Sequence, residues 1–456
     1  MQPALDPTRD EIAAMMNAAS SFVSDFLEGL PTAPAAGLGD GQALVPDLLG
    51  PPGEEPGDFG SLLSTVREAA SYAVETAGPG YLAYFPAGGL FASALADLLA
   101  ATVNRYTGVS SLAPALVAME HGVIRWLCDE FGLPSGSGGV VTTGASTATL
   151  SALGAARQQV LGGPSPAGTV YVTEHTHHCV AKAARIAGLT ADQVREVPVT
   201  AELRMDPDAA REAIRRDRAA GRRPFLLVGT GGTTSTGTVD PLPELGELAR
   251  QEGLWFHVDA AYGGGFQLTG RGRAILSGIE AADSVTLDPH KSLFLPYGTG
   301  VLLVRDQNAL RAAHVADADY LQDLHHDGVL PDFADLGVEL TRDFRGLRLW
   351  LPLRLHGAGA FRAALDEKLD LAAFAHRELR EFADLPVPPD LTVLVFRVPG
   401  GDGANRRLLE AANASKRIFL SSTVLDGRYT PRLCILSHRT HRPHVEEALD
   451  ILRSAA

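Results

Sequence analysis

The middle of the chain, from about residue 80 to 335, alternates short apolar runs with segments whose apolar residues recur every three or four positions. Short apolar runs are typical of buried strands, and the second pattern is typical of helices. The expected strands cover residues 139–143, 169–173, 225–229, 254–259, 284–288 and 300–305. The expected helices cover residues 147–160, 179–187, 207–219 and 242–252. This alternation predicts a mostly parallel α/β sheet with helices on both faces.

The N-terminal region has a different pattern. Residues 10–29 predict an amphipathic helix, because their apolar side chains recur at helical spacing. Residues 31–60 are rich in Pro and Gly and predict an extended arm, which a helix near 61–76 follows. An arm of this kind is too short to fold alone, so we expect it to pack on another surface, such as a second subunit.

The C-terminal region predicts a smaller α+β domain. Its expected elements are a long helix at 345–380, a strand at 391–398, a helix at 404–415, a strand at 432–437 and a final helix at 443–454. We therefore expect an N-terminal arm at residues 1–80, a large α/β domain at 81–335 and a small domain at 336–456.

Composition narrows the class of protein. The 456 residues carry a net charge of −15. This charge argues against a nucleic-acid binder, because such a protein needs a basic surface. No apolar run approaches the roughly 18 residues of a membrane span, so we expect no membrane partner. The three cysteines, Cys128, Cys179 and Cys434, are too few and too widely spaced for a disulfide framework. Their spacing favours the reducing cytoplasm.

Lysine is scarce in this sequence. Only four of the 39 basic residues are lysines, which leaves 39 − 4 = 35 arginines. The lysines are Lys182, Lys291, Lys368 and Lys416. Chemistry that needs an amine nucleophile therefore has four candidates.

Two motifs carry the strongest chemical signal, WFHVDAAYGGG at 255–265 and SVTLDPHKS at 284–292. Asp259 and Lys291 each follow an apolar strand, and the carboxyl ends of such strands face the ligand crevice of an α/β sheet. An amine there can form a Schiff base with a carbonyl cofactor. Pyridoxal phosphate needs a lysine for its aldehyde, an acid for its ring nitrogen and a phosphate cradle. The alternative is a solvated lysine and a turn aspartate, which the apolar sequence around Lys291 disfavours.

The candidate cradle is TTGASTATLSALGAAR at 142–157, where small residues lead from a strand into a helix. The free backbone N–H groups of Ala145 and Ser146 are placed to bind a phosphate. Many strand–turn–helix junctions look similar, so a purely structural turn stays open. The small-residue loop at 229–237 has no GxGxxG spacing, and no GKS or GKT motif occurs, which makes a dinucleotide or ATP site a weak hypothesis.

The histidines at 175, 177 and 178 suggest either a metal site or a cofactor contact. We expect no metal there, because no third ligand lies at a recognisable spacing. A flat imidazole stacked on an aromatic cofactor ring is the better use, and a plain polar loop remains the alternative.

With Asp259, His290 and Lys291 in place, HVDAAYGG and DPHKS resemble the signature of the pyridoxal-phosphate group II amino acid decarboxylases, closest to aromatic L-amino acid decarboxylase. The likeness extends over most of the chain. It includes YLAYFPAGG (81–89), GASTAT (144–149), THHCVAKAARIAG (176–188), DFRGLRLW (343–350) and ILSHRTH (435–441). The resemblance implies a fold-type I enzyme that uses pyridoxal 5'-phosphate, forms a homodimer with its active site at the interface, and decarboxylates an L-amino acid.

The resemblance also implies roles for individual residues. Lys291 would hold the cofactor as a Schiff base, and Asp259 would pair with the pyridine nitrogen. His177 would stack on one face of the ring, with Ala261 against the other. The expected phosphate contacts are Ala145, Ser146, His290 and Ser235.

The family's proton donor is a tyrosine on a mobile loop. The segment ADADYLQDLHHDGVLPDF (316–333) resembles that loop, and Tyr320 matches the tyrosine. In relatives where this residue is phenylalanine, oxygen can react and an aldehyde forms, so Tyr320 favours simple decarboxylation to the amine. Decarboxylating oxidation, transamination and a cofactor-free binding relative remain as alternatives.

The substrate pocket is defined less sharply. Tyr84, Phe85 and Pro86 resemble the aromatic wall of the pocket, with Tyr106 nearby in the sequence. Gly108 stands where aromatic decarboxylases place a phenylalanine from the second subunit. An aromatic or large apolar side chain is favoured. The roles of Arg105 and Arg432, an anion contact or simple packing, stay open.

Overall fold

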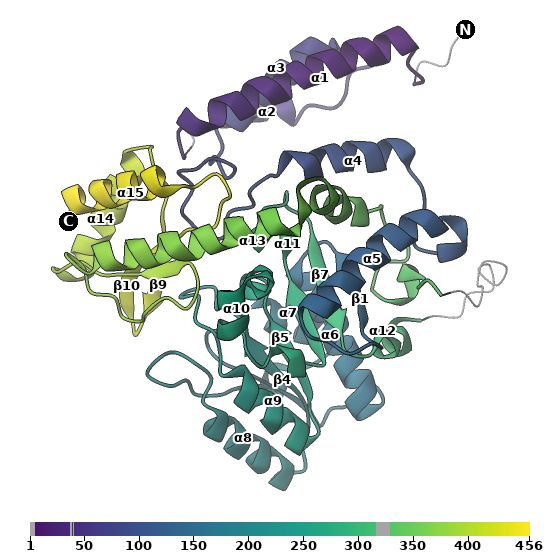
Figure 1. Ribbon diagram of the computed structural model, residues 1–456, viewed down its shortest axis with the longest axis vertical. Helices are drawn as coiled ribbons and strands as arrows, with labels where there is room; N and C mark the ends of the chain where they lie inside the picture. The colour runs from purple at the N-terminus through teal and green to yellow at the C-terminus, as the bar shows by residue number, and fades with distance from the viewer. Residues whose placement is uncertain (1–4, 37–38, 40, 316–328) are drawn as a thin grey trace.

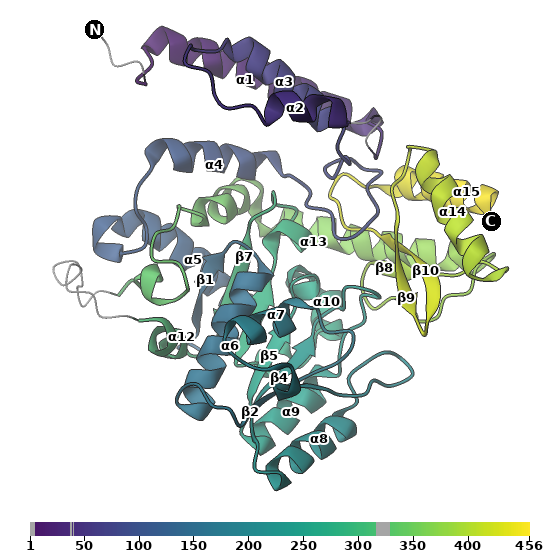
Figure 2. The same cartoon turned by 180° about the vertical axis from the view of Figure 1, so that it is seen from behind.

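The computed structural model describes residues 5–36, 39, 41–315 and 329–456. Its centre is a seven-stranded sheet in the order β1-β7-β6-β5-β4-β2-β3 (Figures 1 and 2). The strands are β1 (Gly138–Thr142), β2 (Gly168–Val172), β3 (Val194–Glu196), β4 (Arg223–Thr230), β5 (Trp255–Asp259), β6 (Ser284–Leu287) and β7 (Gly300–Val304). Only β7 runs antiparallel to its neighbours. The mostly parallel sheet is therefore confirmed, and the short edge strand β3 is an addition to the six expected strands.

Helices surround this sheet in both views. They are α5 (Pro114–Glu130), α6 (Ala145–Leu161), α7 (Cys179–Ile186), α8 (Pro207–Ala219), α9 (Leu242–Glu252), α10 (Gly270–Ile275), α11 (Pro289–Ser292) and α12 (Gln307–His314). Helix α6 packs across the sheet because Ala148, Ala152 and Ala156 form a buried stripe at helical spacing. Their small side chains let the helix lie close to the strands. Gly162 ends the helix in the left-handed conformation.

The C-terminal part forms a second layered unit. Helix α13 (Gly346–Leu379) leads into the antiparallel sheet β8-β10-β9, and α14 (Gly401–Ala414) and α15 (Arg442–Ala455) pack beside it. The strands are β8 (Val393–Val395), β9 (Ser421–Leu425) and β10 (Arg428–Cys434). The expected long helix is kinked at Gly357, whose φ is 74°. The sequence also missed β9, because its residues SSTVL lack a continuous apolar run.

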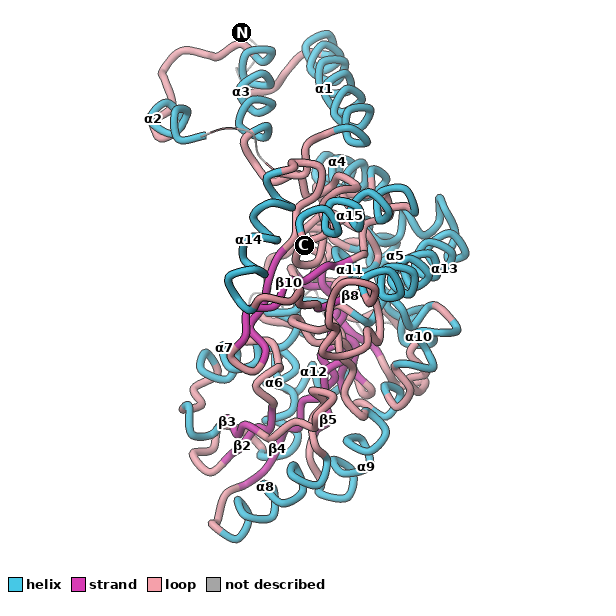
Figure 3. The backbone as a smooth tube through the Cα atoms, turned by 90° about the vertical axis from the view of Figure 1, so that its left-hand side faces the viewer, coloured by secondary structure: helices cyan, strands magenta, loops and turns pink. Residues whose placement is uncertain are grey.

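The N-terminal arm stands away from the body of the molecule (Figure 3). Helix α1 (Arg9–Gly29) begins with a capping box made by Thr8 and Glu11, and α2 (Val45–Leu48) and α3 (Phe59–Ser71) follow. Neither α1 nor α3 buries a single residue within the chain. Helix α4 (Phe91–Val103) then leads into the body. None of the described helices is both long enough and apolar enough to cross a membrane.

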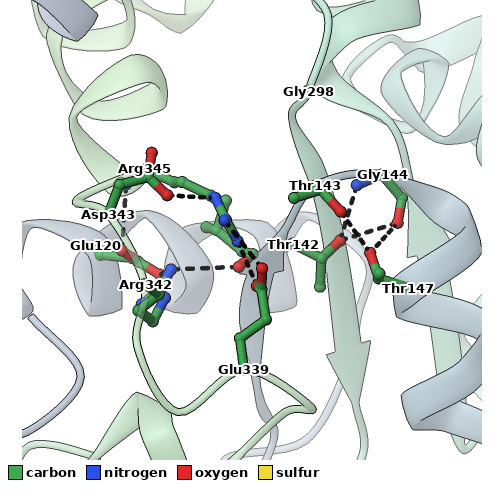
Figure 4. A network of polar contacts seen from close by, with 12 residues as sticks. Glu120, Thr142, Thr143, Gly144, Thr147, Gly298, Glu339, Arg342, Asp343 and Arg345 are labelled. Atoms are coloured by element: carbon green, nitrogen blue, oxygen red, sulfur yellow. Dashed lines mark hydrogen bonds and ion pairs between the residues drawn. The ribbon is translucent and has the colours of Figure 1, made fainter.

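A buried ion pair ties α5 to the start of α13. The Glu120 and Arg342 side chains are 0% and 1% exposed, and Arg342 Nη2 lies 2.7 Å from Glu120 Oε1 (Figure 4). The second oxygen of Glu120 accepts the Gly346 N–H at 3.1 Å, and Arg342 also donates to the carbonyl of Val141 on β1. The pair therefore joins two helices to the strand that precedes α6.

Removal of one member of this pair leaves the other charge buried without its partner. We expect Glu120→Leu to lower the free energy of unfolding by roughly 3–5 kcal/mol. The double variant Glu120→Leu/Arg342→Met should lose less free energy of unfolding than the two single variants lose when their losses are added. Urea denaturation measures both quantities, with Glu212→Ala in an exposed ion pair on α8 as the control, expected to cost less than about 1 kcal/mol. Equal costs for Glu120→Leu and Glu212→Ala would contradict this account.

Candidate active site

The candidate residues converge at one edge of the large sheet. Strand β5 ends at Asp259, and β6 leads into the turn that holds Lys291. The segments after β1, β2 and β4 carry Ala145, His177 and Ser235. All five strands run in the same direction, so their carboxyl ends lie at the same edge.

Lys291 lies in the short helix α11, which only Asp288 separates from the end of β6. Its Nζ atom is 3.1 Å from Asp288 Oδ2, and its side chain is 21% exposed. The same Nζ lies 5.3 Å from the centre of the Phe85 ring. The other carboxylate oxygen of Asp288 is buried without a hydrogen-bond partner. Lys291 is therefore a partly enclosed amine held by an acid, in agreement with the expectation that it is not a solvated lysine.

Asp259 is 4% exposed at the end of β5. Its Oδ1 atom accepts the backbone N–H of Ala261 at 3.1 Å. Ala261 is also buried, and its carbonyl accepts the N–H of Asp288. This bond links the segment after β5 to the turn that holds Lys291, so the acid and the amine have fixed relative positions.

His177 lies in the loop between β2 and α7. Its Nδ1 atom accepts the backbone N–H of Cys179 at 3.3 Å, which places the proton of the neutral ring on Nε2. Burial lowers the pKa of His177, and the nearby Asp259 carboxylate opposes this effect. A neutral imidazole therefore stands beside Asp259 and Lys291, as a stacking ring would.

The start of α6 is the segment that the sequence predicts as the phosphate cradle. Gly144 precedes the helix with φ 154° and ψ 174°, a conformation that only glycine adopts readily. The hydroxyls of Thr142 and Thr147 both bond to the Gly144 carbonyl (Figure 4). The backbone N–H groups of Ala145 and Ser146 are among the first donors of a 17-residue helix, which lack acceptors within the helix.

His290 stands against this cradle. A Cβ atom built on Gly144 would lie 3.6 Å from the Cε1 atom of His290. The Nδ1 atom of His290 is 2.6 Å from the carbonyl of Thr299, and a carbonyl only accepts, so Nδ1 carries a proton. The contact fixes the ring beside the helix start, where an anion would be held.

Ser235 lies in the loop after β4 and is half-buried. Its hydroxyl accepts a hydrogen bond from Thr423 of β9 at 3.1 Å, which connects the large sheet to the C-terminal unit. Beside this contact, the hydroxyls of Thr233, Thr236 and Thr238 form a buried chain. The loop is therefore fixed from both sides.

The end of the same loop is held by Asp240. Its two carboxylate oxygens accept the N–H groups of Met205 and Thr230 at 2.7 and 2.8 Å. Burial raises the pKa of Asp240 from 3.8 to about 6. The native state therefore holds this proton more tightly than the unfolded chain does.

This raised pKa predicts a pH-dependent stability. The contribution of Asp240 is fully present below pH 3.8 and is lost as the pH rises through about 6. As the pH rises, the free energy of unfolding of the wild type should fall relative to that of Asp240→Asn by roughly 3 kcal/mol at most, since each pKa unit corresponds to about 1.4 kcal/mol. Urea denaturation of both proteins between about pH 4.5 and 7.5 measures the difference. A difference that does not change with pH would refute this prediction.

An aromatic wall with a buried cation lies opposite Lys291. The Phe85 ring stacks on Tyr262 with ring centres 4.3 Å apart, and Pro86 is buried beside it. Arg432 Cζ lies 4.8 Å from the centre of the same Phe85 ring. Tyr84 is 60% exposed and has an unusual positive φ of 43°, while its carbonyl accepts a hydrogen bond from Arg432. This backbone strain is typical of functional segments.

Arg432 is 3% exposed and lies on β10. Its Nη1 atom donates to the Tyr84 carbonyl and the Ser421 hydroxyl, but Nε and Nη2 are buried without partners. Burial lowers the pKa of Arg432. This buried guanidinium has two unused donors and lies next to the Phe85 ring, which the Lys291 amine also approaches, so it is a ready anion contact.

Two other candidates, Tyr106 and Arg105, make contacts outside this group of residues. Tyr106 donates its hydroxyl to the carbonyl of Leu340, and a Cβ atom on Gly108 would lie 2.4 Å from this hydroxyl. Arg105 is exposed and donates to the carbonyl of Val103 within its own segment. Tyr320 lies outside the described residues. No cluster of three or more metal-binding side chains occurs in the described parts of the chain.

The sequence did not single out Asp288 or Thr299 as parts of the site. Asp288 could have been found, because it stands three residues before Lys291 and one helical turn brings their side chains together. Thr299 acts through its carbonyl, for which its side chain gives no signal.

Comparison with known proteins identifies the family to which this chain is similar. The model of the pyridoxal-dependent decarboxylase conserved domain matches residues 51–398. An aromatic-L-amino-acid decarboxylase of Bacillus atrophaeus is 33% identical over 82% of this chain and 80% of its own length. A phenylacetaldehyde synthase of Arabidopsis thaliana is 30% identical over 95% of this chain and 94% of its own length.

A solved structure extends the likeness to the whole fold. The crystal structure of Oryza sativa TDC with PLP and tryptamine superposes with a TM-score of 0.94 and 27% identity. The match covers 100% of this chain and 99% of the rice protein.

Proposed function

The chain belongs to the pyridoxal-dependent decarboxylase family and is a pyridoxal-phosphate-dependent amino acid decarboxylase, and we propose that its substrate is an aromatic L-amino acid. The bond between the α-carbon and the carboxyl group breaks, carbon dioxide leaves, and a proton takes its place to give the amine. An aromatic substrate is supported by the name of the Bacillus relative, by the tryptamine in the rice structure, and by the Phe85–Tyr262 wall.

The residues at the sheet edge fit the cofactor group by group. Lys291 offers an enclosed amine for the aldehyde, and Asp259 a buried carboxylate for the ring nitrogen. His177 and Ala261 would lie against the two faces of the ring. The phosphate would be held by the N–H groups of Ala145 and Ser146, by His290 and by Ser235. The Gly-only backbone at the start of α6 is the observation that carries this fit.

Once bound, pyridoxal phosphate supplies the electron sink that makes loss of the carboxyl group possible. Asp259 would keep the ring nitrogen protonated, which a buried carboxylate does through its charge. Asp288 would keep the Lys291 amine at the entrance to the cradle. Tyr320, outside the described residues, would return the proton to the α-carbon.

Arg432 would bind the substrate carboxylate. The unused Nε and Nη2 donors are buried, so an incoming carboxylate would satisfy both and neutralise the charge. This guanidinium and the Lys291 amine both approach the Phe85 ring, at 4.8 and 5.3 Å from its centre. The carboxyl group and the amine nitrogen of one amino acid, which are bonded to the same α-carbon, could therefore meet Arg432 and the Lys291 site together.

A panel of amino acids tests the substrate class. We expect the highest kcat/KM for L-tryptophan, L-tyrosine or L-phenylalanine, with aliphatic and acidic amino acids at least about 10-fold poorer because they fill an aromatic pocket less well. A preference for an acidic amino acid would overturn the aromatic assignment. It would leave the decarboxylase reaction intact.

A second candidate reaction is oxidative decarboxylation to an aldehyde. It is favoured by the 30% identity to phenylacetaldehyde synthase. Tyr320 argues for the amine, because its hydroxyl can donate the proton that the amine requires.

We also expect a homodimer in the cytoplasm. Large apolar side chains are exposed on α1, α3 and α4, which is the pattern of a subunit interface. They include Ile12, Met16, Phe26, Leu62, Val66, Phe91, Leu95, Leu98 and Leu99. Analytical ultracentrifugation should give about twice the 48.0 kDa mass of the chain, and a stable monomer would contradict this expectation. All three cysteines are unpaired and buried.

A further inference from the structure

A chain of buried polar side chains runs between β5 and β6 toward Asp259. The two strands pair so that His257 faces Ser284 and Asp259 faces Thr286. Side chains two residues apart on a strand share one face, so His257 and Asp259 lie on the same face of the sheet. His257, Ser284 and Thr286 are each at most 1% exposed. These polar groups are far from water and belong to no role assigned so far.

Hydrogen-bond directions in this chain follow from its first member. The Trp255 indole N–H, which can only donate, lies 2.7 Å from the Ser284 hydroxyl. The Ser284 oxygen is also 2.8 Å from His257 Nδ1. Since the hydroxyl oxygen accepts from Trp255, its own proton is used best by donation to His257 Nδ1.

This donation fixes the state of His257. A ring that accepts at Nδ1 carries its proton on Nε2, and Nε2 lies 3.4 Å from the Thr286 hydroxyl. Burial lowers the pKa of His257 to about 4, although the Asp259 charge opposes the shift. The imidazole is therefore a neutral donor near neutral pH, and its donating edge faces Thr286, the register partner of Asp259.

We infer that Trp255, Ser284 and His257 form a positioning relay for Asp259, in which the donors follow one another along the paired strands toward the neighbour of the carboxylate that meets the cofactor ring nitrogen. His257 donates to the Thr286 oxygen, which fixes the Thr286 side chain beside Asp259 on the same face of the sheet. The relay therefore fixes the surroundings of Asp259 without placing a second charge in the site. It rests on the role proposed above for Asp259.

Other groups also act on Asp259 and have to be kept constant. Besides His257, the ionisable groups whose charges interact with Asp259 are His177 and Cys179, and Lys291 and Asp288 lie in the same cluster. A useful variant must therefore change the relay alone.

Ser284→Ala removes the hydroxyl that fixes the His257 tautomer. We expect pyridoxal phosphate to bind about 3- to 10-fold more weakly, since a buried hydrogen bond between neutral groups is worth up to about this factor. The pH at which the absorbance of the bound cofactor changes should also shift by about 0.5–1 unit. Both quantities are measured without substrate, by equilibrium dialysis and by absorbance titration of the reconstituted protein.

Tyr171→Phe is the matched control. It removes one hydroxyl from a comparable buried network on β2, where Tyr171 donates to Asp217 at 2.7 Å. This variant should lose stability but keep the cofactor affinity and the titration of the wild type. Trp255→Phe, which fills nearly the same space, is a second test of the relay. It should shift the titration in the same direction as Ser284→Ala, even if the Ser284→Ala protein folds poorly.

Asp259→Asn tests the role of Asp259 separately from the relay that supports it. If Asp259→Asn alters cofactor binding and titration while Ser284→Ala and Trp255→Phe behave like Tyr171→Phe, the relay is refuted and the role of Asp259 stands. If Asp259→Asn leaves both quantities unchanged, the proposed role of Asp259 fails as well.

Discussion

Lys291→Ala protein is expected to lose the absorbance band at about 420 nm that a lysine-bound cofactor gives. Decarboxylase activity should fall at least about 10³-fold, because removal of a covalent catalytic group in other enzymes costs roughly 10⁴–10⁶. The physical reason is the amine itself. The Lys291 amine lies near Asp288 and Phe85, and no other lysine among the described residues lies in the turn directly after a strand of the large sheet.

Lys182→Ala is the control for this experiment, since Lys182 lies on α7 with an exposed side chain. It should retain the absorbance band and the wild-type activity. A Lys291→Ala protein that still shows the band and turns over amino acids would contradict the assignment of the amine.

The second large effect is expected for Arg432→Met. Removal of one partner of a buried, hydrogen-bonded charge pair costs roughly 2–5 kcal/mol, so the apparent affinity for the amino acid should fall at least about 30-fold. The amine product has no carboxylate. Its inhibition constant should therefore change by less than about 3-fold, and the ratio of the two effects identifies the carboxylate contact.

Arg397→Met controls for the loss of a buried arginine. Arg397 is 6% exposed, lies next to the same small sheet, and donates to Thr430 and to the carbonyl of Leu425. Arg397→Met should change the stability of the protein but leave its affinities for the amino acid and for the amine unchanged. Equal losses of amino acid and amine affinity in Arg432→Met would mean that Arg432 only supports the wall through Tyr84.

Periodicity and motif position predicted well which strands carry the candidate site. The six strands expected in the large sheet end where the structure ends them, within one or two residues, because buried strands of such a sheet need continuous apolar runs. Asp259 and Lys291 follow such strands, so their meeting at one edge was predictable. The division into domains at residues 80 and 335 stays a prediction.

Long-range partners were not predictable. The orphaned donors of Arg432 depend on a fold that brings β10 to Tyr84, 348 residues away in the sequence. The burial of one lysine was not predictable from the local sequence either. Lys368 lies in a charged helical stretch, yet it is 0% exposed and donates to the carbonyl of Thr440. Burial alone therefore does not distinguish Lys291, and its position at the strand end does.

The most direct test of the proposed reaction is the product balance of one turnover experiment. Purified protein loaded with pyridoxal phosphate is supplied with its best aromatic L-amino acid, and carbon dioxide, amine, aldehyde and hydrogen peroxide are quantified together. The account predicts carbon dioxide and amine in equal amounts, with no peroxide above the blank. Aldehyde and peroxide in amounts that match the carbon dioxide, or no carbon dioxide from any amino acid, would contradict it.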